Sequence, residues 1–411
     1  MSEKLFEAAL GISTPWYVAG IEFAAAKRLL EIRVDFAVGS RFAIAGVAGE
    51  HPVHDTVNKR YRHLNFFQHE CVLDVRVPRV KLPDGSVRQV TPPWIGKLSG
   101  FTLLFEALVL TLCREMPFRA VARIVGISDY RVREIAERYV NAAVSIGALN
   151  EVRRIAIDET SRARGHDYVT LVADADKRSV VYVAEGNDAR VIEAFSRNVR
   201  LRGGKPSQIE SISMDMWPAF IKGAEQYLPN AQITFDKFHL IAHASKAVDT
   251  TRRMEQKRQP QLKGLRWWLL KDRSALNRAQ RAAVDDLVKQ FATVRTARGW
   301  QFREQLRGIL DRKQPHVVRR MLQRWCSNVL RSKVEPMKEV ARKILRHLEG
   351  VVAWVESRQT NGFLEAINGL FQSAKRRARG YVRFSTIRTV IFLIAGKLDF
   401  SRINPYLAQP T

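Results

Sequence analysis

Stretches of strand-like composition alternate with turns over residues 1–100. Residues 18–23 and 29–36 have the composition of β-strands, and residues 71–77 alternate between apolar and polar positions. Pro92, Pro93 and the glycines at the end of this region then indicate a linker. The pattern predicts an N-terminal domain of short strands that ends near residue 100.

The apolar period becomes helical from residue 101 onwards. It predicts helices over residues 101–114, 118–125 and 130–144. A turn with a good N-cap, residues 126–129, separates the last two helices. This layout is typical of a helix-turn-helix, and we place that domain at residues 101–149.

The next segment predicts an α/β core of the ribonuclease H-like type. Three short apolar strands are followed by helix, strand, helix and strand, which is the order of such a core. The predicted elements are strands 153–160, 168–175 and 179–185, helix 189–202, strand 209–215, helix 218–227 and strand 231–236. The expected divisions are a first part of the core at 150–250, a wholly helical segment at 251–350, and two last helices within 351–411.

Three carboxylates are candidate catalytic metal ligands. Asp158 and Asp215 are placed at the ends of the first and fourth core strands, which are neighbours in a sheet of this order. Glu365 lies one turn into a later helix, on one face with Asn361 and Asn368. Such carboxylates suit two Mg²⁺ ions, for which Mn²⁺ can substitute, acting in an in-line phosphodiester displacement. Because like charges raise one another's pKa, we expect the metal-free site to be partly disordered or protonated.

Two other carboxylates compete for these roles. Asp236 ends the fifth strand, is followed by His239, and could replace Asp215 as the second ligand. Glu159 could replace Asp158, but strand alternation places neighbouring side chains on opposite faces, which favours Asp158.

The net charge of the chain indicates what kind of partner it binds. The 411 residues include 68 Lys and Arg against 41 Asp and Glu, a net charge of +27, so the chain attracts polyanions. Nucleic acid is the expected partner, and a merely solvated basic surface or an acidic membrane is the alternative. Three widely spaced cysteines and the lack of a membrane-length apolar run predict a cytoplasmic, nucleoid-associated protein without a membrane partner.

Two groups of basic residues are candidate DNA contacts, each with a solvated charged face as the alternative. The second helix of the helix-turn-helix carries one group, and the helix beyond Glu365 carries the other, where it could hold phosphates near the metals. The residues are Arg131, Arg133 and Arg138 in the first group, and Lys375, Arg376, Arg377 and Arg379 in the second. Trp267 and Trp268 could stack on an unpaired base, although adjacent tryptophans in a helical bundle more often pack in its core.

These motifs together resemble the bacterial ISL3 family of insertion-sequence transposases, over nearly the whole chain. The matching runs are Ile157-Asp158-Glu159-Thr160 with Arg164-Gly165-His166-Asp167-Tyr168, Ser213-Met214-Asp215-Met216, Phe235-Asp236-Lys237-Phe238-His239, Thr360-Asn361-Gly362-Phe363-Leu364-Glu365-Ala366-Ile367-Asn368 and Lys375-Arg376-Arg377-Ala378-Arg379-Gly380-Tyr381. Each run alone is weak, but their order and spacing together are highly specific.

The resemblance implies a DDE catalytic domain with an all-helical insertion between the fifth strand and the Glu365 helix. The resemblance also implies that Asp236 and His239 form an accessory motif near the site. It further implies that the N-terminal region binds the terminal inverted repeats of the element. Many relatives carry a Cys-rich zinc module before the helix-turn-helix. A set of zinc ligands can be written here as His51, His54, His69 and Cys71, but its spacing matches no standard finger, so we expect folding without zinc.

The resulting hypothesis is a DDE transposase that acts in two steps on double-stranded DNA. Hydrolysis at the element's end frees a 3′-hydroxyl, which then attacks target DNA, and synapsis of two ends requires a homodimer or larger oligomer. A DNA-binding regulator that has lost catalysis would lack one of the three carboxylates. A structure-selective nuclease on the same core would not need the N-terminal domain, the helix-turn-helix and the basic helical segment.

Overall fold

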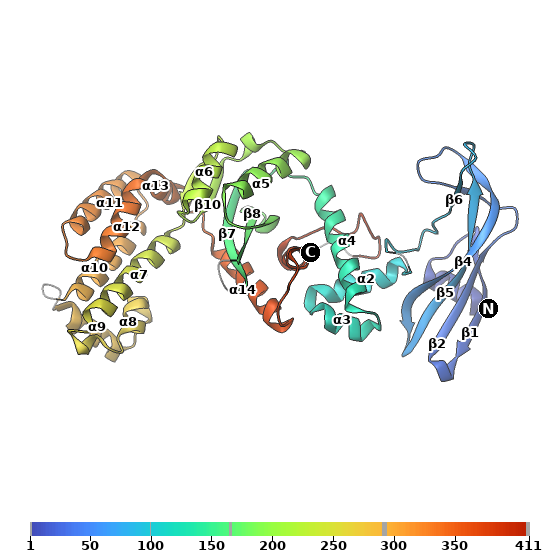
Figure 1. The fold of residues 1–411 in the computed structure, drawn as a ribbon, viewed down its shortest axis with the longest axis horizontal. Helices are drawn as coiled ribbons and strands as arrows, with labels where there is room; N and C mark the ends of the chain where they lie inside the picture. The colour runs from blue at the N-terminus through green and yellow to red at the C-terminus, as the bar shows by residue number, and fades with distance from the viewer. Residues whose placement is uncertain (1, 99, 164–166, 290–293, 408–411) are drawn as a thin grey trace. The chain divides into compact units, whose positions relative to one another are not determined.

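The computed structural model describes residues 2–98, 100–163, 167–289 and 294–407. The chain forms two compact units, Met1–Gly147 with Leu370–Thr411, and Ala148–Gly369. The order of their helices and strands can be followed by colour in Figure 1.

A strand-rich sheet makes up the beginning of the first unit. Its strands run in the order β1-β2-β5-β4-β3, and β6 pairs with β5. The elements are α1 (Ser2–Leu10), β1 (Trp16–Ala24), β2 (Leu29–Phe36), β3 (Arg41–Ala43), β4 (Glu50–Phe66), β5 (His69–Lys81) and β6 (Val87–Gln89).

The prediction of short strands in this sheet was wrong. Strands β4 and β5 are 17 and 13 residues long, and they pair along nearly their whole length. Much of β4 is polar and exposed, as at His54, Asn58 and Arg60, so its side chains give little apolar signal. Backbone pairing with β5 holds this part of the strand, and the apolar pattern of the sequence does not record backbone pairing.

The linker predicted after Pro92 is a packed part of the first unit. Trp94, Ile95 and Leu98 are buried. The buried carboxylate of Glu106 accepts hydrogen bonds from the backbone N–H groups of Lys97 at 2.8 Å and Leu98 at 2.7 Å. The proline and glycine content of this segment therefore reflects tight turns against the helices rather than a flexible connection.

The helices predicted for the helix-turn-helix are confirmed. They are α2 (Leu103–Glu115), α3 (Phe118–Val125) and α4 (Asp129–Ile146), joined by α15 (Phe384–Ala395), which packs on α4 and α2. Gly126 ends α3 with a φ of 73°, a left-handed conformation that glycine adopts without strain. The Ser128 side chain accepts a hydrogen bond from the backbone N–H of Arg131 and caps α4.

A mixed five-stranded sheet forms the centre of the second unit, in the order β11-β10-β7-β8-β9. Strands β7, β8 and β9 are antiparallel, and β10 and β11 run parallel to β7. The bounds are β7 (Arg154–Ala163), β8 (Asp167–Asp174), β9 (Ser179–Glu185), α5 (Ala189–Leu201), β10 (Ser211–Met214), α6 (Pro218–Tyr227) and β11 (Gln232–Phe235). The predicted order of strands and helices is confirmed, and the first and fourth core strands are neighbours.

The helical segment begins at Lys237, directly after β11, and extends to Ser357. Its main helices are α7 (Lys237–Glu255), α8 (Arg266–Leu270), α9 (Arg278–Lys289), α10 (Arg295–Leu310), α11 (Pro315–Leu330), α12 (Glu335–Arg346) and α13 (Leu348–Ser357). The chain then continues into α14 (Gly362–Arg377). None of the described helices is long and apolar enough to cross a membrane.

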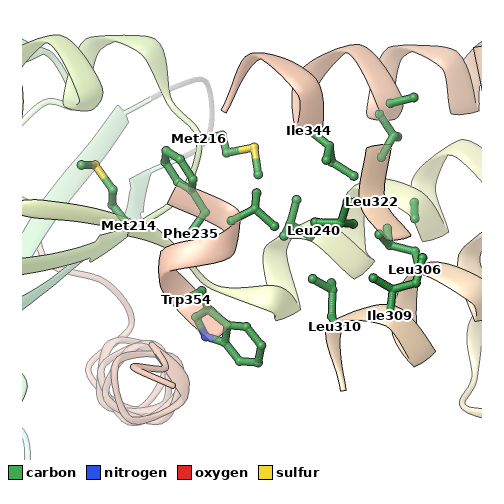
Figure 2. Close-up of a cluster of buried hydrophobic side chains, with 14 of the residues drawn as sticks. Met214, Met216, Phe235, Leu240, Leu306, Ile309, Leu310, Leu322, Ile344 and Trp354 are labelled. Atoms are coloured by element: carbon green, nitrogen blue, oxygen red, sulfur yellow. The ribbon is translucent and has the colours of Figure 1, made fainter. Parts of the chain in front are cut away.

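The sheet and the helices of the second unit share one hydrophobic core. Figure 2 shows Met214 beside Phe235 at the strand ends, then Leu240 of α7, followed by Leu306, Leu322 and Ile344 of the later helices. Continuous packing of this kind makes the helical segment a rigid extension of the sheet. A change at the helical end of this core can therefore shift the strand ends.

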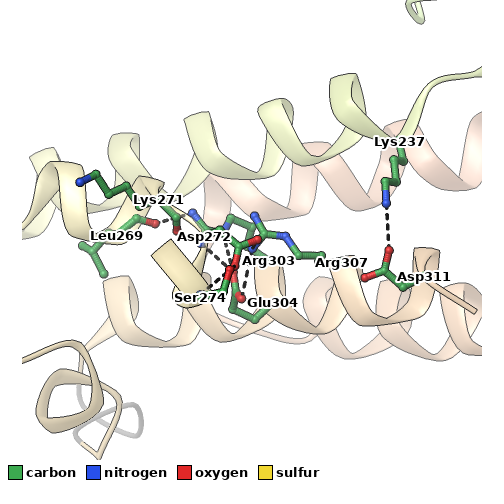
Figure 3. A network of polar contacts seen from close by, with 9 residues as sticks. All are labelled: Lys237, Leu269, Lys271, Asp272, Ser274, Arg303, Glu304, Arg307 and Asp311. Atoms are coloured by element: carbon green, nitrogen blue, oxygen red, sulfur yellow. Dashed lines mark hydrogen bonds and ion pairs between the residues drawn. The ribbon is translucent and has the colours of Figure 1, made fainter. Parts of the chain in front are cut away.

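A buried arginine organises the far part of the helical segment. Arg303 of α10 is fully buried, and its guanidinium donates to the carbonyls of Leu269 and Lys271 and to the carboxylate of Glu304, as Figure 3 shows. The two carbonyls belong to the end of α8, where helical partners are lacking. Arg303 thus supplies the hydrogen bonds that hold α8 on α10.

Replacement of Arg303 by methionine should lower the free energy of unfolding by about 3 kcal/mol, because a partly buried carboxylate and two carbonyls lose their donor. Urea denaturation followed by circular dichroism measures the change. The matched control is Arg324→Met, an exposed arginine of α11 whose loss should cost under about 0.5 kcal/mol. Equal stability of the two variants would contradict the role given to Arg303.

Candidate active site

Asp158 and Asp215 lie where strands β7 and β10 diverge. Strand β10 pairs with β7 through residues 211–213 and ends at Met214, so Asp215 directly follows the strand, as predicted. Asp158 was predicted to end its strand, and this was wrong. It lies within β7, which continues to Ala163 in a hairpin with β8. The Asp158 side chain is nevertheless available to bind a ligand, because the parallel neighbouring strand β10 has already ended at Met214.

A small cavity of about 80 Å³ lies between the two aspartates. Its lining also includes Glu159, Trp217 and His239. The volume is sufficient for a cation with one or two waters. Nε2 of His239 is buried and has no hydrogen-bond partner among the described residues, so the cavity is lined by two aspartates and by a histidine with an unpaired ring nitrogen.

The pKa values of the two aspartates shift in opposite directions. Burial raises the pKa of Asp158, and the nearby carboxylates of Glu365 and Asp215 raise it further. Burial also opposes ionisation of Asp215, but the hydrogen bond with His243 and the nearby His239 outweigh it and lower its pKa to about 2. The pKa of Glu159 is raised, chiefly by burial. The raised pKa of Asp158 is in the direction of the expectation that carboxylates gathered in a metal-free site resist ionisation.

The helical segment contributes a cation next to Asp215. Nζ of Lys343 on α12 lies 2.9 Å from Nε2 of His243 on α7. The same His243 nitrogen lies 3.6 Å from Oδ1 of Asp215. Sequence reasoning missed Lys343, because it is far from Asp215 along the chain and belongs to no recognisable motif.

Glu365 is positioned by the segment of residues 359–368, which we call the anchoring segment. The amide of Gln359 donates to the carbonyl of Ile155 at 2.7 Å, and the amide of Asn361 donates to the carbonyl of Ile157 at 3.1 Å. The Asn368 amide donates to Oδ2 of Asp158 at 2.7 Å. Side-chain amides therefore bind the start of α14 to β7, with Asn368 contacting the candidate metal ligand itself.

Asp236 holds the other side of the anchoring segment. Its buried carboxylate accepts hydrogen bonds from Oγ1 of Thr360 at 2.9 Å and from the backbone N–H of Asn361 at 2.6 Å. Its second oxygen caps α7 through the N–H of Phe238 at 2.9 Å. Because both oxygens are used in this way, the structure favours Asp215 over Asp236 as a metal ligand.

Glu365 itself is exposed and does not line the cavity. Its charge still raises the pKa of Asp158, so the two carboxylates lie within electrostatic reach. In the described part of the chain, no three His, Cys, Asp or Glu side chains are already arranged to hold a metal ion. The structure thus brings together Asp158, Asp215 and His239, and leaves Glu365 beside them on a helix fixed to β7.

Comparison with known proteins identifies the family. The model for the DDE domain of ISL3 elements, described as "Transposase", matches residues 155–391. The chain belongs to the ISL3 family of transposases. A second model, "Helix-turn-helix domain of transposase family ISL3", matches residues 90–140. The resemblance seen in the sequence motifs is confirmed, although residues 164–166 of the first motif lie outside the described residues.

Two curated relatives match most of this ISL3 transposase. The transposase for insertion sequence element IS1001 from Bordetella parapertussis is 26% identical over 340 residues, covering 80% of this chain and 82% of the relative. The transposase for insertion sequence element IS1557 from Mycobacterium tuberculosis is 26% identical over 413 aligned positions, covering 92% of each chain. The protein is a DDE transposase, an enzyme that transposes DNA, and DNA is its partner through the helix-turn-helix domain.

The arginines predicted to contact DNA are partly engaged within the helix-turn-helix domain. Arg131 lies over the ring of Phe101 at 4.8 Å, and Arg133 forms an ion pair with Glu137 at 3.9 Å. Arg138 is exposed but donates to the carbonyl of Lys97. Arg119 of α3 is more open, with 81% of its side chain exposed. Sequence reasoning did not single out Arg119, because spacing alone does not show which arginines stack on the domain itself.

The second basic group lies at the end of α14 and in the turn that follows. Arg376, Arg377 and Arg379 are exposed, and Lys375 is half-buried. These residues belong to the first compact unit, whereas Glu365 belongs to the second.

The four residues written as a zinc set cannot share one ion. His51 and His54 lie near the start of β4, while His69 and Cys71 pair with its end at residues 63–66. At about 3.3 Å per residue, the two pairs are separated by roughly 30 Å or more of extended strand.

The residues at the Asp158 and Asp215 cavity fit a divalent cation, on which DDE transposases generally depend. The ligands are hard oxygen donors that border one small cavity, and the orientation of Asp158 is fixed by Asn368. Burial, followed by the carboxylates of Glu365 and Asp215, raises the pKa of Asp158, and a bound cation would offset this cost of ionising the side chain.

Asp158→Asn should therefore increase the free energy of unfolding of the metal-free protein by about 1 kcal/mol at neutral pH. A raised folded-state pKa means that ionised Asp158 opposes folding, so the gain should vanish as pH falls toward the ordinary carboxyl pKa. Urea denaturation in the presence of EDTA measures both effects. The control Asp176→Asn removes an exposed carboxylate paired with Arg154 and should give no gain, and a similar loss in both variants would contradict the account.

Proposed function

We propose that this ISL3 transposase binds the terminal inverted repeats of its insertion sequence, cleaves DNA there and transfers the freed strand to target DNA. The catalytic core is a ribonuclease H-like fold in which Asp158, Asp215 and Glu365 hold two Mg²⁺ ions. One observation carries the proposal: Asp158 and Asp215 border one cavity on adjacent strands, and Asn368, three residues after Glu365, is hydrogen-bonded to Asp158.

The chain's own residues have distinct roles in this proposal. Divalent ions would supply charge neutralisation for an in-line phosphodiester displacement. Asp158 and Asp215 would hold the ions, and Glu365 would complete the set of carboxylate ligands. His243 lies next to Asp215, and Lys343 lies next to His243. The charge of this lysine offsets phosphate charge near the site. Strand phosphates are held by the basic residues at the end of α14 and in the turn that follows, which are Lys375, Arg376, Arg377 and Arg379.

DNA-end recognition is assigned to the N-terminal sheet and the helix-turn-helix. The exposed Arg119 and Arg138 contact DNA phosphates, while Arg131 and Arg133 also stack on aromatic rings within the domain. Synapsis of two ends requires at least a dimer on DNA. Mn²⁺ substitutes for Mg²⁺ because it also accepts oxygen ligands in octahedral geometry.

Glu365→Gln should lower Mg²⁺-dependent cleavage of a labelled duplex carrying the element's own end by more than about 100-fold, with end binding retained. The wild-type product should carry a 3′-hydroxyl. The control is Glu339→Gln, which removes an exposed carboxylate on α12 and should leave cleavage unchanged.

Cleavage by the Glu365→Gln variant at the wild-type rate would remove Glu365 from the metal site. Binding without any cleavage by wild type would instead favour a DNA-binding role over the proposed reaction. Cleavage without joining to a second duplex would favour a nuclease.

A further inference from the structure

An exposed tryptophan lies on the helical segment, away from the candidate active site. Trp267 of α8 has 63% of its surface exposed, whereas the adjacent Trp268 packs against the core. The guanidinium of Arg266 lies over the Trp267 ring, 4.8 Å from its centroid. One indole face thus carries a cation, and an indole this exposed remains available for a flat partner to stack on it.

The surface around Trp267 has more positive charge than it can neutralise. A single carboxylate, Asp249 of α7, faces Arg252 at 2.8 Å, Arg253 at 3.5 Å and Arg266 at 3.6 Å. The side chains of Arg253 and Arg266 are 62% and 51% exposed. Two of the three guanidinium groups therefore remain accessible to an external anion.

The connection between α7 and α8 adds further cations. Lys257, Arg258 and Lys263 are exposed, and none forms an ion pair with another described residue. Glu255 is the other acidic residue in residues 249–271, which contain seven Lys and Arg. Its carboxylate is already used at the start of α10, where it accepts from the N–H groups of Arg295 and Thr296 at 2.7 Å.

We propose that this surface, which we call the α8 patch (Arg253, Lys257, Arg258, Lys263, Arg266 and Trp267), binds an unpaired DNA strand. The strand's bases stack on Trp267, and its phosphates contact the surrounding cations. A polyanion matches the charge, and an unpaired base matches an exposed indole because paired bases hide their faces. The identity of the nucleic acid as DNA rests on the proposed transposase function; the binding chemistry rests on the patch alone.

Binding of a fluorescent oligothymidine and of a hairpin duplex with the same number of phosphates tests the proposal. Fluorescence anisotropy is measured with full-length protein in EDTA, so no catalysis is involved. Trp267→Ala should weaken oligothymidine binding by about tenfold and change duplex binding less than twofold, and Trp267→Phe should retain most of the affinity. Arg253→Gln with Arg266→Gln should weaken oligothymidine binding to a similar extent and reduce its salt dependence.

The matched control is Arg324→Gln with Arg342→Gln, which removes the same charge from α11 and α12 and should leave strand binding within twofold of wild type. Thermal denaturation verifies that each variant is folded. Unchanged oligothymidine affinity in Trp267→Ala would overturn the proposal, as would an equal loss for the strand and the duplex. A change of oligomeric state in place of a change in strand binding would assign the patch to protein contacts and also overturn it.

The test of strand binding by the α8 patch and the test of the proposed catalytic function can fail independently. Loss of strand binding in Trp267→Ala supports the patch even if Glu365→Gln cleaves like wild type. Conversely, a strictly Glu365-dependent cleavage with unchanged strand binding in Trp267→Ala leaves the catalytic assignment intact and removes the patch.

Discussion

The hydrogen bonds between the anchoring segment and strand β7 are the constraint on which the catalytic site depends. Glu365 follows β11 only after the whole helical segment, so chain connectivity alone leaves it free to lie almost anywhere. Gln359, Asn361 and Asn368 remove that freedom by donating to β7 and to Asp158. Asp236 fixes the same segment from β11. A buried polar network of this kind stabilises only one arrangement, because every misplaced partner would remain unsatisfied.

This arrangement explains why the sequence motif that contains the Glu365 carboxylate also contains the amide side chains of Asn361 and Asn368. One oxygen of Asp236 holds the start of the Glu365 helix and the other caps α7, so Asp236 acts by positioning, while His239 of the same motif lines the cavity with Asp158 and Asp215. The shared core of sheet and helices has a similar effect on the opposite side, where it brings Lys343 to His243. The helical segment is thus a structural part of the candidate active site as well as the location of the proposed strand-binding patch.

The sequence predicted those features that leave a periodic or local signature. Apolar strands, helix periods and the position of Asp215 after its strand were all recognisable, and neighbouring strands could then be inferred from their order. Strand β4 was not recognisable as a long strand, because its polar residues are held by backbone pairing. The contact of Gln359 with Ile155 and Ser211 was also beyond prediction, since a single amide reaching across more than a hundred residues leaves no pattern. The exposure of Trp267, in contrast to Trp268, depends on packing that the sequence does not encode locally.

Anomalous X-ray diffraction from crystals grown with Mn²⁺ tests the central claim most directly. Mn²⁺ should give an anomalous peak within coordination distance of carboxylate oxygens of both Asp158 and Asp215, with the Glu365 side chain turned toward the site and Asn368 still bonded to Asp158. A peak on Asp236 in place of Asp215, or Glu365 remaining turned away with both ions bound, would contradict the account.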